Sequence, residues 1–210
     1  QPLVGQESTK RGSAMTRIIA GRAGGRTLRT PPGSGTRPTS DRVREALFSA
    51  LQARDLIEGA RVLDLYAGSG ALGLEAASRG AAEVVLVESD RRAAKVIADN
   101  IKDLALPGVR ARPTTVATYL GSRPTAYATQ ETEPRREGTF DLVFIDPPYD
   151  LGETDLAAVL DTLATDDWLA DDALVIVERS TRSPEPTWPT GWAAEKVRRY
   201  GETALWFAGC

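Results

Sequence analysis

The feature that most restricts how this chain can fold is a short apolar run that leads directly into a glycine-rich turn. Residues 61–66 (RVLDLY) have the pattern of a buried strand, and Gly68-Ser69-Gly70 follow at once. Glycine allows the backbone to turn sharply and to approach a ligand closely. Residues 71–79 then have helical character, and residues 83–88 (EVVLVE) have the pattern of a second strand. This succession predicts an α/β unit in which the two strands run parallel.

The segments that follow continue the alternation of strands and helices. We expect further helices over 91–104 and 154–164, strands over 109–112, 140–146 and 173–178, and a terminal hairpin within about 193–208. The predicted fold is therefore α/β, with a mainly parallel, doubly wound sheet. Residues 121–139 are rich in Pro, Thr and Glu, which is typical of a surface loop.

The first 45 residues differ from the rest in charge. They hold nine Lys and Arg against three Asp and Glu, whereas the remaining residues hold 17 and 26. A basic arm on an acidic body is typical of nucleic-acid binding. A solubilising tail would have the same composition, so both interpretations stay open.

Three N-terminal units are expected from the local patterns. Residues 1–15 are predicted to be a disordered tail, and residues 16–38 a basic extension with a small β-hairpin around Gly24-Gly25. The main domain is predicted to span 39–210 and to open with a helix, capped by Thr39 or Ser40, that runs to about Ala53.

The composition excludes several kinds of catalysis. The chain has no histidine, and its one cysteine is Cys210. Histidine bases, Ser-His or Cys-His pairs and His or Cys metal clusters are therefore excluded, and we expect no metal. Catalysis must use carboxylates, backbone groups, aromatic rings or a cofactor with its own reactive carbon. No apolar run approaches the roughly 20 residues of a membrane helix and no signal peptide is evident, so we expect a cytoplasmic protein without membrane contacts.

Two carboxylates near the glycine turn suggest the class of cofactor. Asp64 ends the first strand, where it could accept a hydrogen bond from the ammonium group of an amino-acid-bearing cofactor and would repel a pyrophosphate. Glu88 ends the second strand and could accept both ribose hydroxyls of an adenosine. The three glycines at 68, 70 and 73 also satisfy the dinucleotide pattern, so they do not choose between NAD and S-adenosylmethionine (SAM).

The strongest chemical signal is Asp146-Pro147-Pro148-Tyr149, which follows a buried strand. The two prolines fix φ and remove two backbone donors. The Asp146 carboxylate and the Pro147 carbonyl are then a rigid pair of acceptors, which could bind the hydrogens of an aromatic amine and raise the nucleophilicity of its nitrogen. The Tyr149 ring could stack on the base. These residues indicate methylation of the exocyclic amine of a nucleobase, with adenine, guanine and cytosine all open.

With these motifs in view, the chain resembles the class I SAM-dependent methyltransferases that carry an (Asn/Asp)-Pro-Pro-(Tyr/Phe) signature. More narrowly, it resembles the bacterial 16S rRNA guanine-N2 methyltransferase family, small-subunit methyltransferase D, over residues 16–208. The specific features are residues 17–21 (RIIAG), 37–48 (RPTSDRVREALF), 64–76 (DLYAGSGALGLEA), 146–149 (DPPY) and 177–178 (VE).

The resemblance implies a Rossmann-like, seven-stranded sheet, SAM as cofactor with S-adenosylhomocysteine as product, and a guanine of 16S rRNA as substrate. The substrate would be presented in the 30S subunit or its precursor to a monomeric enzyme. The implied cofactor-binding residues are Asp64, Tyr66, Ala67, Gly68, Ser69, Gly70, Glu88, Ser89, Thr115 and Val116. The family pattern at the last two positions is Asp or Asn followed by Ala, from which this chain departs. The residues expected to bind RNA are Arg17, Arg22, Arg26, Arg37, Thr39, Arg42 and Arg44.

Other interpretations stay open at this point. Arg42 and Arg44 could instead form ion pairs with Asp41 and Glu45 on the helix surface. An N6-adenine methyltransferase acting on DNA or RNA would use the same tetrapeptide. A non-catalytic RNA-binding assembly factor would need the basic arm but neither Asp64 nor the tetrapeptide.

Overall fold

The computed structural model describes residues 15–33, 38–122, 139–165 and 167–210, without the side chains of Pro38 and Thr39. Residues 1–14 of the predicted tail, Arg37 and most of the predicted loop 121–139 lie outside the described residues. The elements in chain order are β1 (Thr16–Arg17), β2 (Thr27–Leu28), α1 (Pro38–Ala53), β3 (Arg61–Leu65), α2 (Ala71–Ser78), β4 (Glu83–Glu88), α3 (Arg91–Leu104), β5 (Val109–Pro113), α4 (Val116–Gly121), β6 (Phe140–Ile145), α5 (Glu153–Thr165), β7 (Leu169–Ser180), β8 (Ala193–Ala194), β9 (Arg198–Tyr200) and β10 (Thr203–Gly209).

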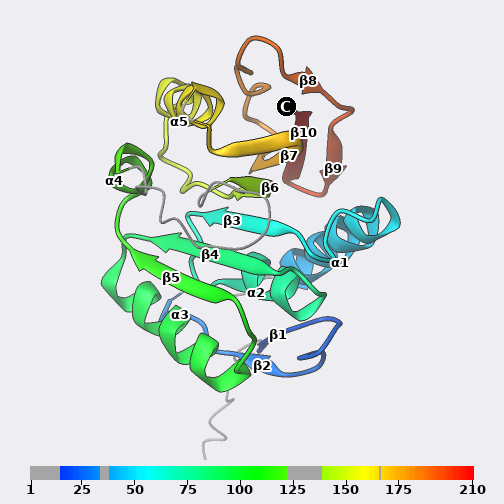
Figure 1. Ribbon diagram of the computed structural model, residues 1–210, viewed down its shortest axis with the longest axis vertical. Coiled ribbons are helices and arrows are strands. Elements are labelled where there is room, and N and C mark those ends of the chain that lie inside the picture. Colours follow the sequence, from blue (N-terminus) through cyan, green and yellow to red (C-terminus); the bar gives the residue numbers. More distant parts are fainter. Residues whose placement is uncertain (1–14, 34–37, 123–138, 166) are drawn as a thin grey trace, which may run out of the picture.

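One twisted sheet forms the centre of the molecule (Figure 1). Its order is β5-β4-β3-β6-β7-β10-β8, with β9 also paired to β10. The first five strands are parallel, and β10 is antiparallel to β7. The described sheet has eight strands because β8 and β9 pair in succession along the same side of β10, as two pieces of one edge strand. The predicted parallel, doubly wound sheet with an antiparallel end is confirmed.

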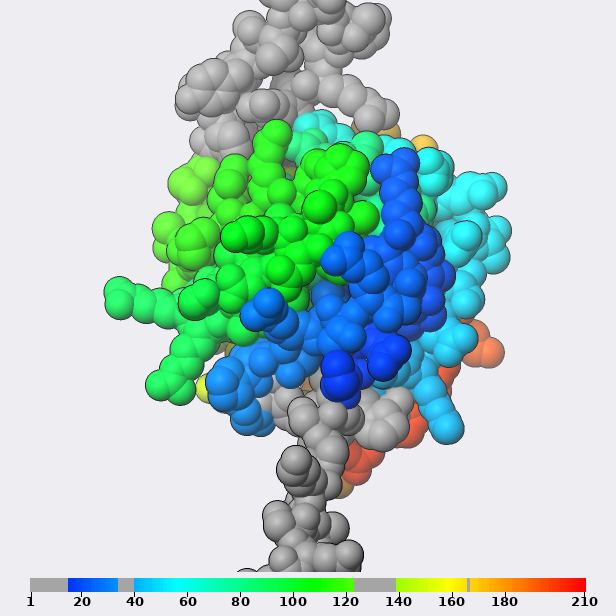
Figure 2. Space-filling model, turned by 90° about the horizontal axis from the view of Figure 1, so that it is seen from below, coloured from blue at the N-terminus to red at the C-terminus, as the bar shows by residue number. Residues whose placement is uncertain are grey.

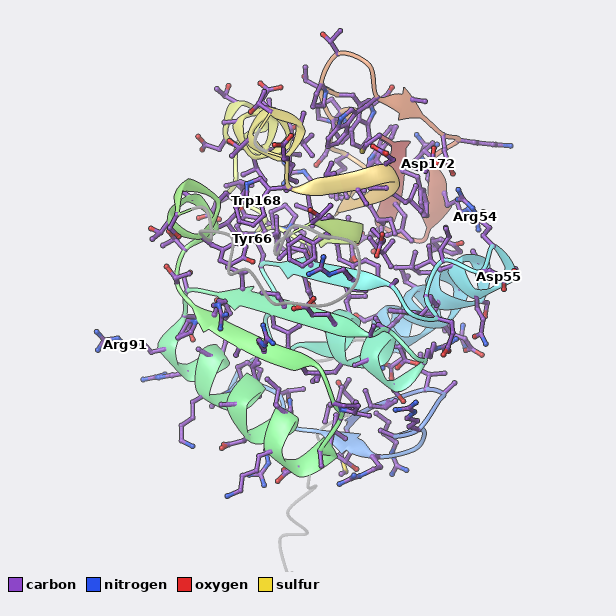
Figure 3. The ribbon with its side chains drawn as sticks, viewed as in Figure 1. Arg54, Asp55, Tyr66, Arg91, Trp168 and Asp172 are labelled. Atoms are coloured by element: carbon purple, nitrogen blue, oxygen red, sulfur yellow. The ribbon has the colours of Figure 1, made fainter. Side chains whose placement is uncertain are left out.

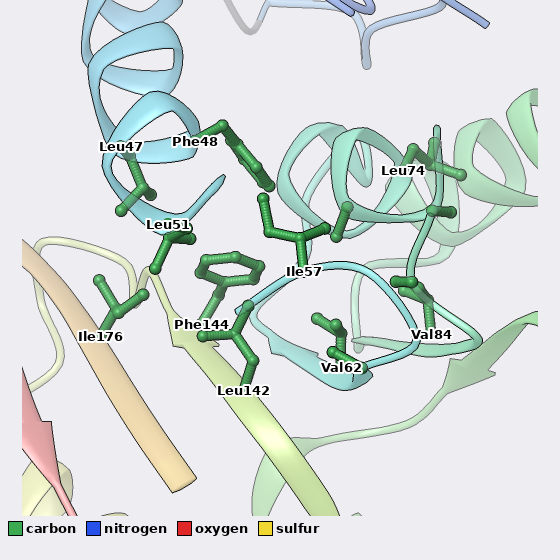
Figure 4. Packing of buried hydrophobic residues seen from close by; sticks show 14 of the residues in the cluster. Leu47, Phe48, Leu51, Ile57, Val62, Leu74, Val84, Leu142, Phe144 and Ile176 are labelled. Carbon is green, nitrogen blue, oxygen red and sulfur yellow. The ribbon is translucent and has the colours of Figure 1, made fainter. Parts of the chain in front are cut away.

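Helices cover both faces of the sheet, which is why the central strands are apolar on both sides. On one face α1, α2 and α3 pack against residues such as Val62, Val84 and Phe144. Figure 4 shows this layer, in which Phe48 and Leu51 of α1 lie over the β6 side chains. On the other face α4 and α5 cover a second cluster. Within the described ranges, no helix is long and apolar enough to cross a membrane.

The N-terminal segment packs into the main domain instead of standing apart from it. Ile18, Ala23 and Leu28 are at most 2% exposed and belong to the cluster beneath α1 and α2. The Glu75 carboxylate of α2 accepts hydrogen bonds from the backbone N–H groups of Ile19 and Ala20, at 2.8 and 3.1 Å. Figure 2 shows this segment in blue, lying against the green residues of α3. The basic extension is therefore fixed by the core of the domain.

Several predicted boundaries were wrong. Helix α1 begins at Pro38, so Thr39 and Ser40 lie inside its first turn and do not precede it. Proline suits that position because the first N–H groups of a helix have no intrahelical partner. Strand β7 is twice as long as the six residues predicted, and the hairpin strands β1 and β2 have two residues each. Helix α4 was not predicted, because six residues are too few to show a helical period.

Candidate active site

The main cavity opens where the parallel strands end. It has a volume of about 580 Å³ and is lined by residues that follow β3, β4, β6 and β7, with Ser40 of α1. The chain leaves β3 for β4 on one side and reaches β6 on the other, so this is the point at which the strand order reverses. Ligands of open α/β sheets bind in the crevice at such a point. The fold thus places the crevice beside the glycine turn and the Asp146 tetrapeptide.

The glycine turn is held in an unusual backbone conformation. Tyr66, Gly68 and Gly70 have φ values of 62°, 59° and 83°. Glycine adopts positive φ at little cost, whereas a side chain such as that of Tyr66 is strained by roughly 1–3 kcal/mol. Figure 3 shows Tyr66 where β3 ends, and its side chain lines the cavity. Gly73 has a different purpose, since a Cβ there would lie 2.2 Å from Leu86 and would push α2 away from β4.

The sequence led us to expect Asp64 on the cavity wall, but it is not among the residues that line the cavity. It is 1% exposed, and its Oδ2 accepts a hydrogen bond of 2.9 Å from the N–H of Gly73. Its Oδ1 is buried and has no hydrogen-bond partner among the described residues. Burial raises the pKa of Asp64 to about 8, and the charges of Asp146 and Glu88 add to the increase against the Gly73 hydrogen bond. Asp64 therefore holds the start of α2 against the turn, and its contact with the cofactor stays a prediction.

Glu88 joins the turn to the next strand. Its Oε2 accepts a hydrogen bond from the N–H of Gly68, and its Oε1 accepts one from the N–H of Asp90, both at 2.8 Å. Glu88 lines the main cavity and also a neighbouring hollow of about 180 Å³, together with Tyr66 and Ser89. Thr115 and Val116 lie in the wall of that hollow. The Thr115 hydroxyl also caps α4, accepting a 3.0 Å hydrogen bond from the N–H of Thr118.

The Asp146 tetrapeptide forms the floor of the main cavity. The N–H of Asp146 donates to the Leu65 carbonyl at 3.4 Å, which aligns the end of β6 with the start of the turn. Asp146 remains open to the cavity, but partial desolvation by the protein atoms packed around its carboxylate raises its pKa to about 6. At neutral pH the carboxylate is therefore mostly ionised and acts as an acceptor. The Tyr149 ring is 86% exposed, so one aromatic surface at the cavity is open to a planar ligand.

Several lining residues were not assigned a role from the sequence. They are Ser40, Glu178, Arg179, Ser180, Ser183, Glu202 and Thr203. Glu178 could have been found, because it is the acid at the end of the apolar run predicted as a strand over 173–178, as Glu88 and Asp146 are at the ends of theirs. Burial, followed by the charge of Asp146, raises the pKa of Glu178 to about 8.

Arg179 connects β7 to the segment after the tetrapeptide. Its Nη2 donates to the Leu151 carbonyl at 3.0 Å and pairs with the Glu153 carboxylate at 2.5 Å. The Arg179 side chain is 7% exposed, so it is the buried support of that loop.

The arginines predicted to bind RNA divide into two groups. Arg17, Arg22 and Arg42 are exposed, and no side-chain ion pair or hydrogen bond holds them within the described residues. Arg44 is 6% exposed and is paired with Asp41 at 3.3 Å and with Glu75 at 3.9 Å, so its assignment to RNA was wrong. It also donates to the Arg17 carbonyl.

Arg26 has a structural role as well. Its guanidinium donates to the carbonyls of Asp103 and Leu104, at the C-terminal end of α3. Cations are favourable there because the last carbonyls of a helix carry a partial negative charge. The side chain of Thr39 is not described, so its predicted RNA contact stays a prediction.

The comparisons with known proteins agree with this geometry. The family model described as "Conserved hypothetical protein 95" matches residues 16–209. The Ribosomal RNA small subunit methyltransferase D of Escherichia coli K12 is 37% identical over 193 residues, which cover 92% of this chain and 89% of that protein. The protein of the same name from Haemophilus influenzae is 34% identical, with 92% and 93% covered.

A solved structure has the same architecture. That of the putative methyltransferase yhhF from Escherichia coli superimposes with a TM-score of 0.76 at 33% identity, covering 93% of this chain and 97% of that one. Both the sequence match and the structural match extend over nearly the whole chain. The chain therefore belongs to the ribosomal RNA small subunit methyltransferase D family and has its Rossmann-like methyltransferase fold.

Proposed function

We propose that this protein transfers a methyl group from SAM to the exocyclic N2 amine of a guanine in 16S rRNA. The observation that carries the proposal is the position of Asp146-Pro147-Pro148-Tyr149 in the same cavity as the glycine turn and Glu88. The family adds the class of RNA, since the relatives from Escherichia coli and Haemophilus influenzae are named as small-subunit rRNA methyltransferases. The substrate is then the small ribosomal subunit or its precursor.

The walls of the cavity fit SAM better than a dinucleotide. Glu88, Asp146, Glu178 and Glu202 all lie on them. SAM carries a positive sulfonium and an ammonium group, which favour such walls, whereas a pyrophosphate is repelled by them. Arg179 is the one basic side chain in the described lining, and Glu153 already neutralises it. The hollow beyond Glu88 would then take the adenine, and the two oxygens of Glu88 the ribose hydroxyls.

When bound, SAM supplies an electrophilic methyl group, so the residues need only hold and orient the amine. The Asp146 carboxylate and the Pro147 carbonyl accept hydrogen bonds from its two N–H groups, and the carboxylate is placed to take the proton that the amine loses when it gains the methyl group and the thioether product leaves. The two prolines keep these acceptors from moving, because each fixes its own φ. The exposed Tyr149 ring stacks on the base once it has been flipped out of the RNA. Positioning of this kind supplies most of the catalysis when the two reactants are held in line.

Nucleoside analysis tests the proposal. Small subunits from cells that lack this protein are incubated with the protein and SAM, and the 16S rRNA is digested and examined by mass spectrometry. The expected product is N2-methylguanosine at one position. The appearance of N6-methyladenosine would favour the adenine alternative, and the absence of any methylated nucleoside, together with no SAM binding in calorimetry, would favour an assembly factor.

The exposed arginines are expected to bind the phosphates of the RNA. Ser40 lines the cavity, Arg44 lies one helical turn further along α1, and Arg44 holds the backbone of Arg17. Arg42 therefore lies beside the rim and Arg17 about one helical turn from it, whereas Arg22 lies further away, where its N–H donates to the Ser78 carbonyl at the end of α2. Each phosphate contact contributes about 0.7–0.9 to the slope of log K against log salt concentration. Replacing all three by glutamine should raise the KM for rRNA, reduce that slope by about 2–3 and leave SAM affinity unchanged.

A charge-matched control distinguishes local contacts from net charge. Arg54, Lys196 and Arg199 are exposed, and Arg54 lies roughly 21 Å along α1 from Ser40. Replacing these three by glutamine should change the salt slope little. Equal slopes for both triple variants would contradict the assignment. Deletion of residues 1–30 is a poor test, because Ile18, Ala23 and Leu28 belong to the core.

A further inference from the structure

Two carboxylates lie side by side on the cavity floor. Strands β6 and β7 are parallel, and Ile145 is paired with Val177. The next residues are Asp146 and Glu178, and neighbouring strands are about 4.8 Å apart. Residues opposite one another in adjacent strands point to the same face of the sheet. Both side chains line the main cavity, and burial, followed by the charge of Asp146, raises the pKa of Glu178, so the two carboxylates are close enough for one planar ligand to meet both.

No contact among the described residues accounts for the partly buried position of the Glu178 carboxylate. Within the described part of the chain, no hydrogen bond or ion pair satisfies it, although it is more than half buried. Arg179, its neighbour on β7, is engaged by Leu151 and Glu153. The other charged groups on the walls are the acids Glu88 and Glu202. When both carboxylates are ionised they only accept hydrogen bonds, so a ligand with adjacent donors suits that form of the floor.

Guanine has such a row of donors. Its N1–H lies next to the exocyclic N2 amine, so three hydrogens point along one edge. In adenine and cytosine the ring nitrogen beside the exocyclic amine is an acceptor instead. When a wrong ligand leaves a buried polar group of the site without a hydrogen-bond partner, the site discriminates strongly against that ligand. A second carboxylate beside Asp146 therefore favours guanine over the other two bases with an amine.

We propose that Glu178 accepts a hydrogen bond from the N1–H of the target guanine, while Asp146 and the Pro147 carbonyl hold its N2 amine. Glu178 is thus the residue that selects guanine in this site. The inference rests on the proposed function and specifies how that site reads its base.

The charge state of Glu178 makes the idea testable by pH. The ionised carboxylate is the stronger acceptor for N1–H, because a hydrogen bond to a charged group is stronger than one to a neutral carboxyl oxygen, and the pKa of Glu178 is raised to about 8 in the free protein. The ionised fraction therefore grows as the pH rises towards 8. The positive sulfonium of SAM favours ionisation, so the transition with bound cofactor should lie at or below that pH. For the wild-type enzyme, kcat/KM for rRNA should increase through this transition and level off about one pH unit above its midpoint.

The experiment compares wild type with Glu178→Gln between pH 6 and 9 at saturating SAM, with N2-methylguanosine as the readout. Glutamine has nearly the same shape but does not titrate. We expect the rise in kcat/KM with a midpoint at or below pH 8 to disappear, and kcat/KM at pH 8.5 to fall about 10–100-fold, the size of one hydrogen bond to a charged group. SAM affinity from calorimetry should fall by much less than kcat/KM, because Glu178 adds only its charge to the walls around SAM, and the thermal midpoint should stay close to wild type.

Two further variants keep the result interpretable. Asp172→Asn removes a carboxylate from the exposed start of the same strand, where φ is 62° and asparagine is well tolerated, and it should have the wild-type pH profile. Glu178→Asp retains the charge on a shorter side chain, so it should keep the pH transition at a lower kcat/KM. If Glu178→Gln does not fold, unchanged kcat/KM in Glu178→Asp overturns the proposal.

The outcomes also separate this inference from the proposed function. If wild type yields N6-methyladenosine, or no methylated nucleoside, the proposed function is wrong. If Glu178→Gln yields N2-methylguanosine with the wild-type rate and pH profile, the function stands and only the role of Glu178 is lost.

Discussion

Asp146→Ala is expected to reduce kcat by about 10²–10⁴-fold, the range for removing a positioned group that takes a proton from the substrate. The carboxylate is one of two acceptors for the amine, and alanine leaves only the Pro147 carbonyl. Cofactor affinity should remain within about tenfold of wild type, a difference of no more than about 1.4 kcal/mol. The turn and Glu88, on the opposite side of the cavity, are untouched by the change.

Single-turnover methylation of small subunits measures the chemical step, and calorimetry with SAM measures binding. Asp146→Asn is the matched variant, because the amide oxygen still accepts one hydrogen bond, and it should retain more activity than alanine. Turnover of Asp146→Ala within about threefold of wild type, well under 1 kcal/mol, would remove this residue from the mechanism.

Glu75→Ala is expected to have the largest effect on stability. Glu75 is completely buried and receives the N–H groups of Ile19 and Ala20 and the guanidinium of Arg79, with Arg44 at 3.9 Å. Removing one partner of a buried ion pair costs roughly 3–5 kcal/mol, because the remaining charge stays buried without compensation. Burial already lowers the pKa of Arg44, with Glu75 the main opposing influence. The N-terminal segment should also become sensitive to protease.

Urea denaturation gives the free energy of unfolding, and limited proteolysis followed by mass analysis locates the first cuts. Glu75→Gln should be intermediate, since its amide oxygen can accept from only part of this set of donors. Asp99→Asn removes an exposed pair with Lys95 and should cost less than about 1 kcal/mol. If Glu75→Ala lost as little free energy of unfolding as Asp99→Asn, the buried hydrogen bonds and ion pairs of Glu75 would not be what holds the N-terminal segment.

The local elements could be predicted where sequence signals are also local. Strand β4 and helix α3 have the boundaries expected, because Asp90 caps the helix and its side chain accepts from the N–H of Ala93. Helix α4 was missed because Thr115 caps only six residues. The length of β7 could not be foreseen, since its first residues are strand-like only through pairing with neighbouring strands.

The residues of the site also divide into those that the sequence could predict and those that it could not. Each strand-end acid, Glu88 and Asp146, was recognisable from its own neighbourhood. The role of Arg44 was not, since Glu75 and the Arg17 carbonyl, which bury it, are distant in the chain. Asp64 was expected to contact the cofactor because strand-end acids often do, but the packing of α2 on β4 turns it towards Gly73.

The sequence by itself therefore determined the order of strands and helices, the glycine turn and the chemical character of Asp146-Pro147-Pro148-Tyr149. Each depends on residues within about ten positions, so backbone preferences and periodicity are sufficient. Only the tertiary structure decided that Glu178 stands beside Asp146, that the N-terminal segment is clamped by Glu75, and that Asp64 lies beneath the cavity. These depend on strand register and helix packing between distant segments, which no local pattern encodes.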